Sequence, residues 1–161
     1  MPFTPFHFGV GIAAKAVVAR RFSLGLFVAL QVVIDLESLY NLVYHRYPVH
    51  RYLHTFVGAT VLAFLCSAFL LGATKVWDAR RGRPVRRQHA ALLATALFAT
   101  WSHVLLDSIM HSDIRPFWPM TDFNPLLSLV LDGPLHLACM ALGLLGLVAL
   151  AFRWSLRKHD A

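Results

Sequence analysis

Charged side chains are scarce in this sequence. Only 14% of its 161 residues are charged, against roughly a quarter in an average soluble protein. The stretches 55–74 and 134–152 contain no Asp, Glu, Lys or Arg at all. The helices of a soluble bundle need polar faces, which these two stretches do not provide. We therefore expect a membrane protein rather than a soluble all-helical one.

The charge-poor stretches are long enough to cross a bilayer, because a transmembrane helix needs about 20 mainly apolar residues. The candidate spans are 22–44, 55–74, 88–106 and 134–152. A shorter apolar stretch, 6–19, is interrupted by Lys15 and predicts a short membrane-embedded helix. The expected fold class is an all-α polytopic membrane helical bundle, with about four transmembrane helices plus this N-terminal helix. We expect 1–161 to form a single integral membrane domain.

Cysteine is also rare. Cys66 and Cys139 both lie inside apolar spans and have no CxxC spacing, so we interpret them as packing residues. A site built from several sulfur ligands is thereby excluded, and a metal centre would have to use nitrogen and oxygen donors.

The basic residues are distributed unequally between the two ends of the candidate spans. Of the 15 lysines and arginines, all but Arg46, Arg51 and Arg115 fall on one side if each span crosses the membrane once. The positive-inside rule makes that side cytoplasmic. We therefore expect a cytoplasmic C-terminus and outward-facing connections at 45–54 and 111–133.

The net charge of +7 raises the alternative of nucleic-acid binding, and the run RRGRPVRR at 80–87 is typical of a phosphate-binding tract. The same run lies between two candidate spans, where the positive-inside rule expects basic residues. We therefore expect the lipid bilayer as the partner and no nucleic acid. The sequence leaves the oligomeric state open.

The histidines gather at the opposite side from most of the basic residues. All of the 9 histidines except His89 and His159 fall at or near the predicted outer side. The acidic residues Asp35, Glu37 and Asp107 lie toward the outer ends of their spans. Ionisable groups at membrane depth are costly and usually mark functional sites. The sequence thus predicts one polar site near the outer end of the bundle.

One stripe of polar residues runs along the third span. His103, Asp107 and His111 follow one another at regular four-residue steps in "SHVLLDSIMH". On a helix of 3.6 residues per turn they share a face, so an imidazole and a carboxylate could hold the same metal ion. The alternative is a helix cap with a hydrogen-bonded core histidine. We favour ligands, with His103 and Asp107 ahead of His111, which stands near the expected helix end.

Four further histidines are candidates of different strength. In "HRYLHT", His50 and His54 would share one face if the helix has begun by His50, which is the geometry of zinc-binding helices. His54 is the better ligand, because His50 could instead be a loop group that supports the site. His7 is a further candidate ligand on the same outer side. His136 is single, and a cap or loop contact explains it equally well.

The acidic pair Asp35 and Glu37 lies inside an apolar span. Residues two apart point about 200° from each other on a helix. One of them could bind a metal while the other serves as general base, and we assign the base to Glu37. A salt bridge to Arg51 or Arg115 is the alternative for one of the two.

The donor set consists of nitrogen and oxygen, which suits zinc, manganese or iron. We take zinc as the first choice, with one ion or with two ions bridged by a carboxylate. Arg51, Arg115 and His111 would then bind a phosphate-like anion of the substrate. The segment "DIRPFWP" would form an aromatic lid, with Phe117 and Trp118 at the level of the lipid headgroups.

The order of these motifs resembles a known family. An N-terminal histidine, the acidic "IDLE", an "HR…HT" element, "SHVLLDS" and a tryptophan-proline element resemble the membrane-bound metal-dependent hydrolases, which are bacterial inner-membrane proteins that include LexA-regulated members. Two departures are Ile34, where the family has proline, and the spacing of the two histidines in the "HR…HT" element, which is one residue shorter here. The resemblance implies as site residues His7, Asp35, Glu37, His50, Arg51, His54, His103 and Asp107.

Together these patterns predict a metal-dependent hydrolase. Metal-activated water would attack an ester or phosphoester, such as one in a phospholipid, at a His/Asp site on the outer side of the membrane. The resemblance implies a bacterial inner membrane, with the site facing the periplasm. Two alternatives are a small metal-ion or proton transporter that uses the same cluster and a non-enzymatic structural membrane protein.

Overall fold

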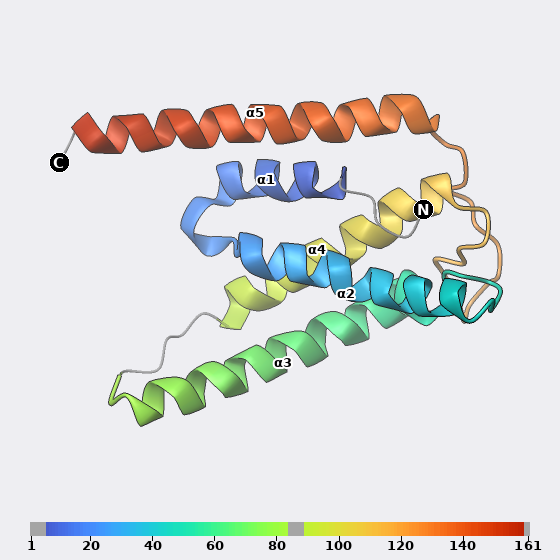
Figure 1. The fold of residues 1–161 in the computed structure, drawn as a ribbon, viewed down its shortest axis with the longest axis horizontal. Helices are drawn as coiled ribbons and strands as arrows, with labels where there is room; N and C mark the ends of the chain where they lie inside the picture. The colour runs from blue at the N-terminus through green and yellow to red at the C-terminus, as the bar shows by residue number, and fades with distance from the viewer. Residues whose placement is uncertain (1–5, 84–88, 160–161) are drawn as a thin grey trace.

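The computed structural model of the protein describes residues 6–83 and 89–159. Within these residues the chain forms five α-helices and two short 3-10 helices, with no β-strand (Figure 1). The all-α fold class is therefore confirmed. The elements are α1 (His7–Val18), η1 (Ala19–Arg21), α2 (Leu24–Val43), η2 (Tyr52–His54), α3 (Phe56–Arg80), α4 (His89–Met110) and α5 (Asp132–His159).

Four of the described helices, α2 to α5, are long and apolar enough to cross a membrane, and α1 is apolar but only 12 residues long. The predicted span 55–74 lies within α3 except for its first residue, Thr55, which is the N-cap, and α3 continues to Arg80; the span 134–152 lies within α5. Gln88, the predicted start of the third span, lies outside the described residues. The chain is thus a helical membrane bundle with a short additional helix at its N-terminal end.

Two side-chain caps decide where α2 and α3 begin. The hydroxyl of Ser23 accepts a hydrogen bond from the backbone N–H of Leu26, and the hydroxyl of Thr55 accepts one from Gly58. Such caps satisfy backbone donors that the first helical turn leaves free. The cap at Thr55 matters for the site, because it ends the loop that carries His54 directly at the start of α3.

The helices run back and forth between two ends of the molecule (Figure 1). The connections 44–55 and 111–131 lie together at the right-hand end of Figure 1, whereas η1, residues 81–83 and the end of α5 lie at the opposite end. Successive connections therefore lie at alternate ends of the molecule, as they must if each long helix crosses a membrane once. Arg86 and Arg87, which belong to the predicted cytoplasmic run, lie outside the described residues.

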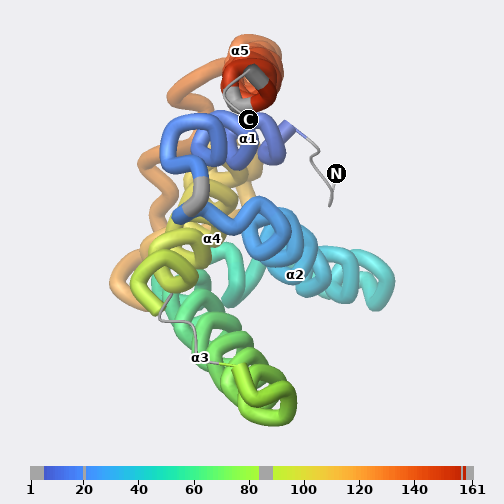
Figure 2. Tube along the Cα trace, turned by 90° about the vertical axis from the view of Figure 1, so that its left-hand side faces the viewer, coloured from blue at the N-terminus to red at the C-terminus, as the bar shows by residue number. Residues whose placement is uncertain are grey.

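The helices stack in layers, which Figure 2 shows nearly end-on. Helix α5 covers α1, α1 packs on α2 and α4, and α3 packs on the other side of α4. A Cβ atom on Gly9 would collide with the backbone carbonyl of Cys139, so α1 and α5 approach closely only because residue 9 is glycine. This contact fixes the start of α1, where His7 lies.

Candidate metal centre

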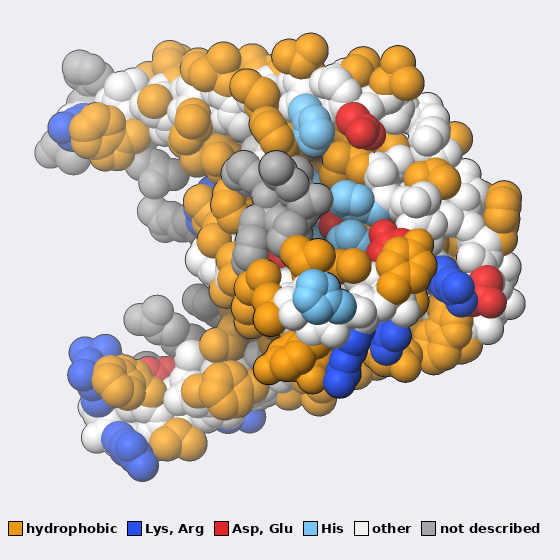
Figure 3. All heavy atoms as spheres, turned by 45° about the vertical axis from the view of Figure 1, so that its right-hand side comes forward, with side chains coloured by type: hydrophobic (Ala, Val, Ile, Leu, Met, Phe, Trp, Pro, Cys, Tyr) orange, Lys and Arg blue, Asp and Glu red, His pale blue; other side chains and the backbone are white. Residues whose placement is uncertain are grey.

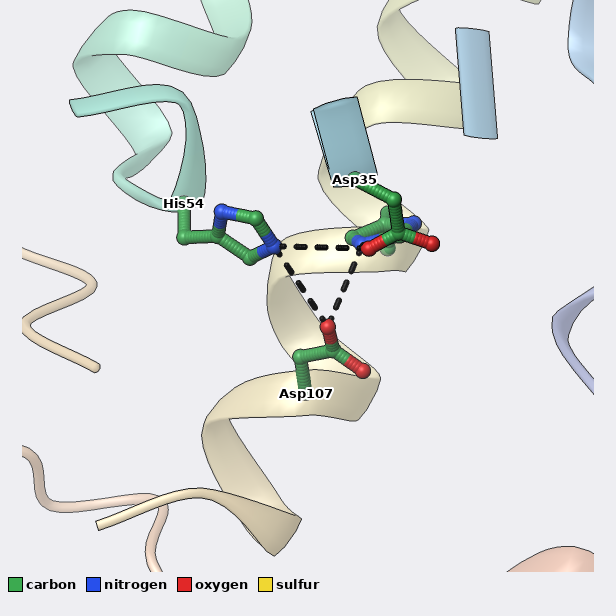
Figure 4. A group of neighbouring side chains, drawn as sticks. Asp35, His54 and Asp107 are labelled. Carbon is green, nitrogen blue, oxygen red and sulfur yellow. Dashed lines mark ion pairs between the residues drawn. The ribbon is translucent and has the colours of Figure 1, made fainter. Parts of the chain in front are cut away.

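Four buried side chains meet near the end of the bundle that carries the two long connections. Asp35 comes from α2, His54 from η2, and His103 and Asp107 from α4, with exposed fractions of 5%, 0%, 1% and 2%. Each offers one ligand atom within 4.8 Å of the others. Figure 3 views this end of the molecule and shows histidine and acidic side chains gathered within hydrophobic surface. In Figure 4, Asp35, His54 and Asp107 point toward one another from three elements.

The distances between donors match those around a small metal ion. His54 Nε2 lies 3.8 Å from Asp35 Oδ1 and 3.6 Å from Asp107 Oδ2. His103 Nε2 lies 3.3 Å and 3.1 Å from the same two oxygens. Zinc–ligand bonds of about 2.1 Å place neighbouring donors of a tetrahedral site about 3.4 Å apart. The four distances bracket this value, so the four donors lie where they could hold a small metal ion.

Several atoms of the cluster have no hydrogen-bond partner among the described residues. They are His7 Nε2, His54 Nδ1 and Nε2, His103 Nε2 and Asp107 Oδ1. Buried polar atoms are nearly always hydrogen-bonded, and each exception calls for an explanation. Here the unpaired nitrogens face carboxylate oxygens at short distance without aligned hydrogen bonds, which is the arrangement of ligands around a shared cation. A buried excess of carboxylates also requires a positive charge.

Gln31 determines which nitrogen of His103 faces the cluster. The side-chain amide of Gln31 donates a hydrogen bond from Nε2 to the carbonyl oxygen of Ala99 at 3.1 Å. Its Oε1 therefore faces His103 and accepts from Nδ1–H at 2.5 Å. With the proton held on Nδ1, the lone pair of Nε2 points to Asp35 and Asp107. This is how proteins orient a histidine that binds a metal.

Glu37 organises the turn that carries His54. Its two carboxylate oxygens accept the backbone N–H groups of Tyr52 and Leu53 at 3.1 and 2.8 Å, and Oε2 lies 3.8 Å from His54 Nδ1. A Cβ on Gly58 would collide with the Tyr52 carbonyl, so this glycine lets the turn fold back onto α3. The structure therefore gives Glu37 a positioning role beside the cluster.

The alternative of a salt bridge from the acidic pair to Arg51 or Arg115 is wrong. Arg51 donates instead to the backbone carbonyls of Tyr47 and Pro48, at 3.2 and 3.3 Å. Arg115 pairs with Asp122 at 2.8 Å. Both arginines lie in the connections 44–55 and 111–131, and their hydrogen-bond partners are these backbone carbonyls and Asp122 rather than Asp35 or Glu37.

The carboxylates around His54 strongly favour its positive form. Burial disfavours a charged imidazole, but the carboxylates of Asp107, Asp35 and Glu37 outweigh it and raise the pKa of His54 to about 10. A raised pKa here reports how negative the cluster is. The same field that attracts a proton would attract a metal cation.

His7 lies beside Asp107, at the carboxylate oxygen that faces neither His54 nor His103. Its Nε2 is 3.3 Å from Asp107 Oδ1, while Asp107 Oδ2 faces His54 and His103. Its ring meets that of His103 edge-on, with centroids 4.9 Å apart. The structure thus brings His7 to the cluster, next to the second oxygen of a shared carboxylate.

His50 belongs to a second cluster. Its Nδ1 lies 2.8 Å from Asp113 Oδ1, and its ring stacks on His111 with centroids 4.5 Å apart. The condition for His50 and His54 to share a helical face, a helix that has begun by His50, is not met, because α3 begins only at Phe56. His50 is a loop residue, as in the alternative interpretation. The two rings nevertheless come within 4.7 Å, since the loop folds back on itself. His111 lies just past the end of α4, which explains why it leaves the stripe of His103 and Asp107.

In this second cluster Asp113 has its hydrogen bonds satisfied. Its Oδ2 accepts the backbone N–H groups of Val49 and His50 at 2.9 and 3.1 Å. Burial alone would raise the pKa of Asp113, but these bonds and the His50 ring hold it well below its usual range. Burial lowers the pKa of His111. The second cluster therefore forms a hydrogen-bonded pair that fixes the loop.

Two residues of these clusters, Gln31 and Asp113, were not among the predicted site residues. The sequence could have identified Gln31, because it is a polar residue four positions before Asp35 in an apolar helix and therefore lies on the same helical face. Asp113 lies in an irregular loop, where spacing carries no information. His136 joins neither cluster and packs against Phe6, with ring centroids 4.3 Å apart.

The predicted lid segment lies over the turn at His54. The backbone N–H of Phe56 donates to the carbonyl of Pro116 at 2.8 Å, and the Phe117 ring packs on Phe56. The Trp118 ring meets Tyr52 edge-on at a centroid distance of 5.6 Å. The segment is thus packed against the wall of the site.

Comparison of the chain with protein-family models, curated proteins and solved structures finds no match.

Proposed function

We propose that the protein is a metal-dependent hydrolase that binds one zinc ion through Asp35, His54, His103 and Asp107. The observation that carries this proposal is that the unpaired, buried Nε2 atoms of His54 and His103 each lie 3.1–3.8 Å from carboxylate oxygens of Asp35 and Asp107, near the donor spacing of a tetrahedral site. Four protein ligands fill a tetrahedral shell, so a zinc ion here would have to take a water as a fifth ligand or release one carboxylate to make room for it. That water would have a lowered pKa, and the ion would polarise the oxygen of an ester or phosphoester.

The residues around the four ligands have distinct roles in this proposal. Gln31 fixes the tautomer of His103, and Glu37 holds the turn of His54 in place. Both oxygens of Glu37 are engaged by backbone N–H groups, which favours a positioning role over that of general base. His7 has an unpaired Nε2 beside Asp107, so it is the better group to take a proton at the site.

Hydrophobic packing argues against the transporter alternative. Toward the other end of α2 and α4, the buried side chains include the apolar Phe27, Leu30, Ala96 and Ala99, with exposed fractions of 1% or less. The buried hydroxyls of Thr95 and Thr100 donate to carbonyls of their own helix. A transported ion would need polar groups to continue its path toward the other end. This layer of apolar side chains favours a site that opens to one side, as an enzyme requires.

The location follows from the basic residues and from the resemblance in motif order. We propose that the protein lies in the bacterial inner membrane and belongs among the membrane-bound metal-dependent hydrolases. The end that carries η1 and the last turns of α5 is rich in lysine and arginine, so it would be cytoplasmic. The metal centre at the other end would then face the periplasm.

The test is hydrolysis by the full chain, purified in detergent and loaded with zinc. We expect it to cleave bis(p-nitrophenyl) phosphate or p-nitrophenyl acetate, to lose this activity in the presence of a chelator, and to regain it with added zinc. Asp35→Asn should be inactive, whereas Asp132→Asn, at an exposed acid in the first turn of α5, should remain active. Unchanged activity in Asp35→Asn, or zinc binding without hydrolysis of either substrate class, would contradict the proposal.

A further inference from the structure

A separate pocket lies beside the metal centre at the same end of the molecule. It has a volume of about 240 Å³, and its lining includes His50, Arg51, Tyr52, Thr55, Arg115 and Trp118. By share of liquid volume this is room for about eight water molecules. The pocket can therefore hold a small polar group but not a lipid with its acyl chains.

The lining of the pocket is positively charged. Arg51 and Arg115 line it, and none of its described lining residues is acidic. Arg51 uses Nε and Nη2 for backbone carbonyls, and Arg115 uses Nη1 for Asp122, which leaves other N–H groups of both guanidinium groups for a ligand. Thr55 adds the N-terminus of the 25-residue helix α3, whose dipole favours an anion.

Asp122 neutralises part of this charge through Arg115 Nη1, whereas the carboxylates of Asp113 and Glu37 have other partners. Asp113 binds the His50 ring and two backbone N–H groups, and Glu37 binds the N–H groups of Tyr52 and Leu53. Both acids are therefore held in the loop behind the pocket rather than paired with its arginines. Planar guanidinium groups match the oxygens of phosphate in a bidentate manner.

We propose that this pocket binds a phosphate-type oxyanion and so selects phosphoester substrates for the metal centre. That the bound anion is part of a substrate rests on the proposed function; that the pocket binds an oxyanion does not. The pocket and the centre share a wall, because His50 lines the pocket and its ring lies 4.7 Å from that of His54. Thr55 follows His54 directly in the chain.

The rim of the pocket suits a group at a membrane surface. Tyr52 and Trp118 are 58% and 40% exposed, and such aromatic residues lie at the level of lipid headgroups. Phosphate could reach the pocket as a soluble phosphoester or as the headgroup of a lipid whose chains stay in the bilayer. The chemistry recognised by the arginines is the same in both cases.

The test is calorimetric titration of the detergent-purified full chain, before and after chelator treatment, with glycerol 3-phosphate and with short-chain phosphatidic acid. In the chelator-treated protein we expect Arg115→Gln and Arg51→Gln each to weaken binding about tenfold or more. Arg46→Gln should bind normally, because Arg46 packs over the Tyr40 ring outside the pocket. Arg115 is half exposed, so its variant keeps the test valid even if Arg51→Gln disturbs the loop.

Two comparisons complete the experiment. If phosphatidic acid binds more tightly than glycerol 3-phosphate, the phosphate group belongs to a lipid. If the two bind equally, it belongs to a soluble phosphoester. Binding that is equal in Arg115→Gln and Arg46→Gln, or that acetate displaces as well as phosphate does, overturns the proposal. If the chain binds phosphate but cannot bind zinc, the proposed hydrolase function is refuted and the anion pocket is supported. If the chain binds zinc but not phosphate, the anion pocket is refuted and the proposed metal site is supported.

Discussion

The hydrogen bond between Gln31 and His103 gives a sharp prediction, because Gln31 orients a proposed ligand without being a ligand itself. Gln31→Leu keeps the size of the side chain and removes the acceptor of His103 Nδ1–H. The carbonyl of Ala99 remains satisfied, since the hydroxyl of Ser102 also donates to it at 3.1 Å. The substitution therefore leaves one buried donor unpaired and frees the ring to rotate or to change its tautomer.

The magnitude follows from that single loss. Removing the partner that orients a ligand histidine typically weakens metal binding by 10–100-fold, which is about 1.4–2.8 kcal/mol. The unpaired Nδ1–H should also lower the free energy of unfolding by about 1–3 kcal/mol. Gln31→Glu restores an acceptor for Nδ1–H, so its zinc affinity should return to within about tenfold of the original protein.

The assay is competition for zinc against a chromogenic chelator, with thermal unfolding measured in parallel. Thr100→Val is the matched control, because Thr100 is fully buried one turn before His103 and its hydroxyl bonds only within α4. It should lose stability without losing zinc affinity. If Gln31→Leu binds zinc as tightly as Thr100→Val does, Gln31 does not orient a ligand, and the assignment of His103 Nε2 to the metal is refuted.

Three further predictions address the surroundings of the centre. Asp113→Asn leaves one acceptor oxygen where there were two, so either the His50 ring or the backbone N–H groups of Val49 and His50 lose their partner. The free energy of unfolding should fall by about 1–3 kcal/mol while elemental analysis shows unchanged zinc; loss of metal would show that the second cluster binds an ion. The pKa of His54 in the folded protein is about 10, so zinc must displace a proton from this side chain below that pH. The zinc affinity should therefore rise about tenfold per pH unit between about pH 7 and 9. A zinc affinity that does not change with pH in competition assays would contradict this. Gly9→Val should separate α1 from α5 and lower the melting temperature through a cost of about 1–3 kcal/mol, whereas Gly25→Val, where a Cβ meets nothing, should cost less.

The sequence predicts the helices well and the site in part. The lengths of the apolar stretches place α2 to α5 correctly, because the length and composition of a stretch are enough to identify a membrane span. The step from His103 to Asp107 is also readable, since both lie inside one regular helix. The convergence of Asp35 with them required only that α2 and α4 pack side by side.

The parts that the sequence could not predict depend on irregular backbone. His50 and His54 separate into two clusters because the Thr55 cap starts α3 late, after a turn held by Glu37. Asp113 pairs with His50 across 63 positions, a contact that spacing does not encode. The positioning role of Glu37 also depends on this turn. The backbone N–H groups of Tyr52 and Leu53, which belong to the turn, bind both of its carboxylate oxygens.

The central claim is that the stripe of His103 and Asp107 is half of a metal centre. The most direct measurement is elemental analysis of the full chain purified in detergent and dialysed after zinc loading. We predict about one zinc per chain in the original protein and in His89→Ala, an exposed histidine at the other end of α4. Asp107→Asn and His54→Ala should contain almost none while eluting as folded protein. Equal zinc in all four proteins, or none in the original protein after loading, would contradict the account.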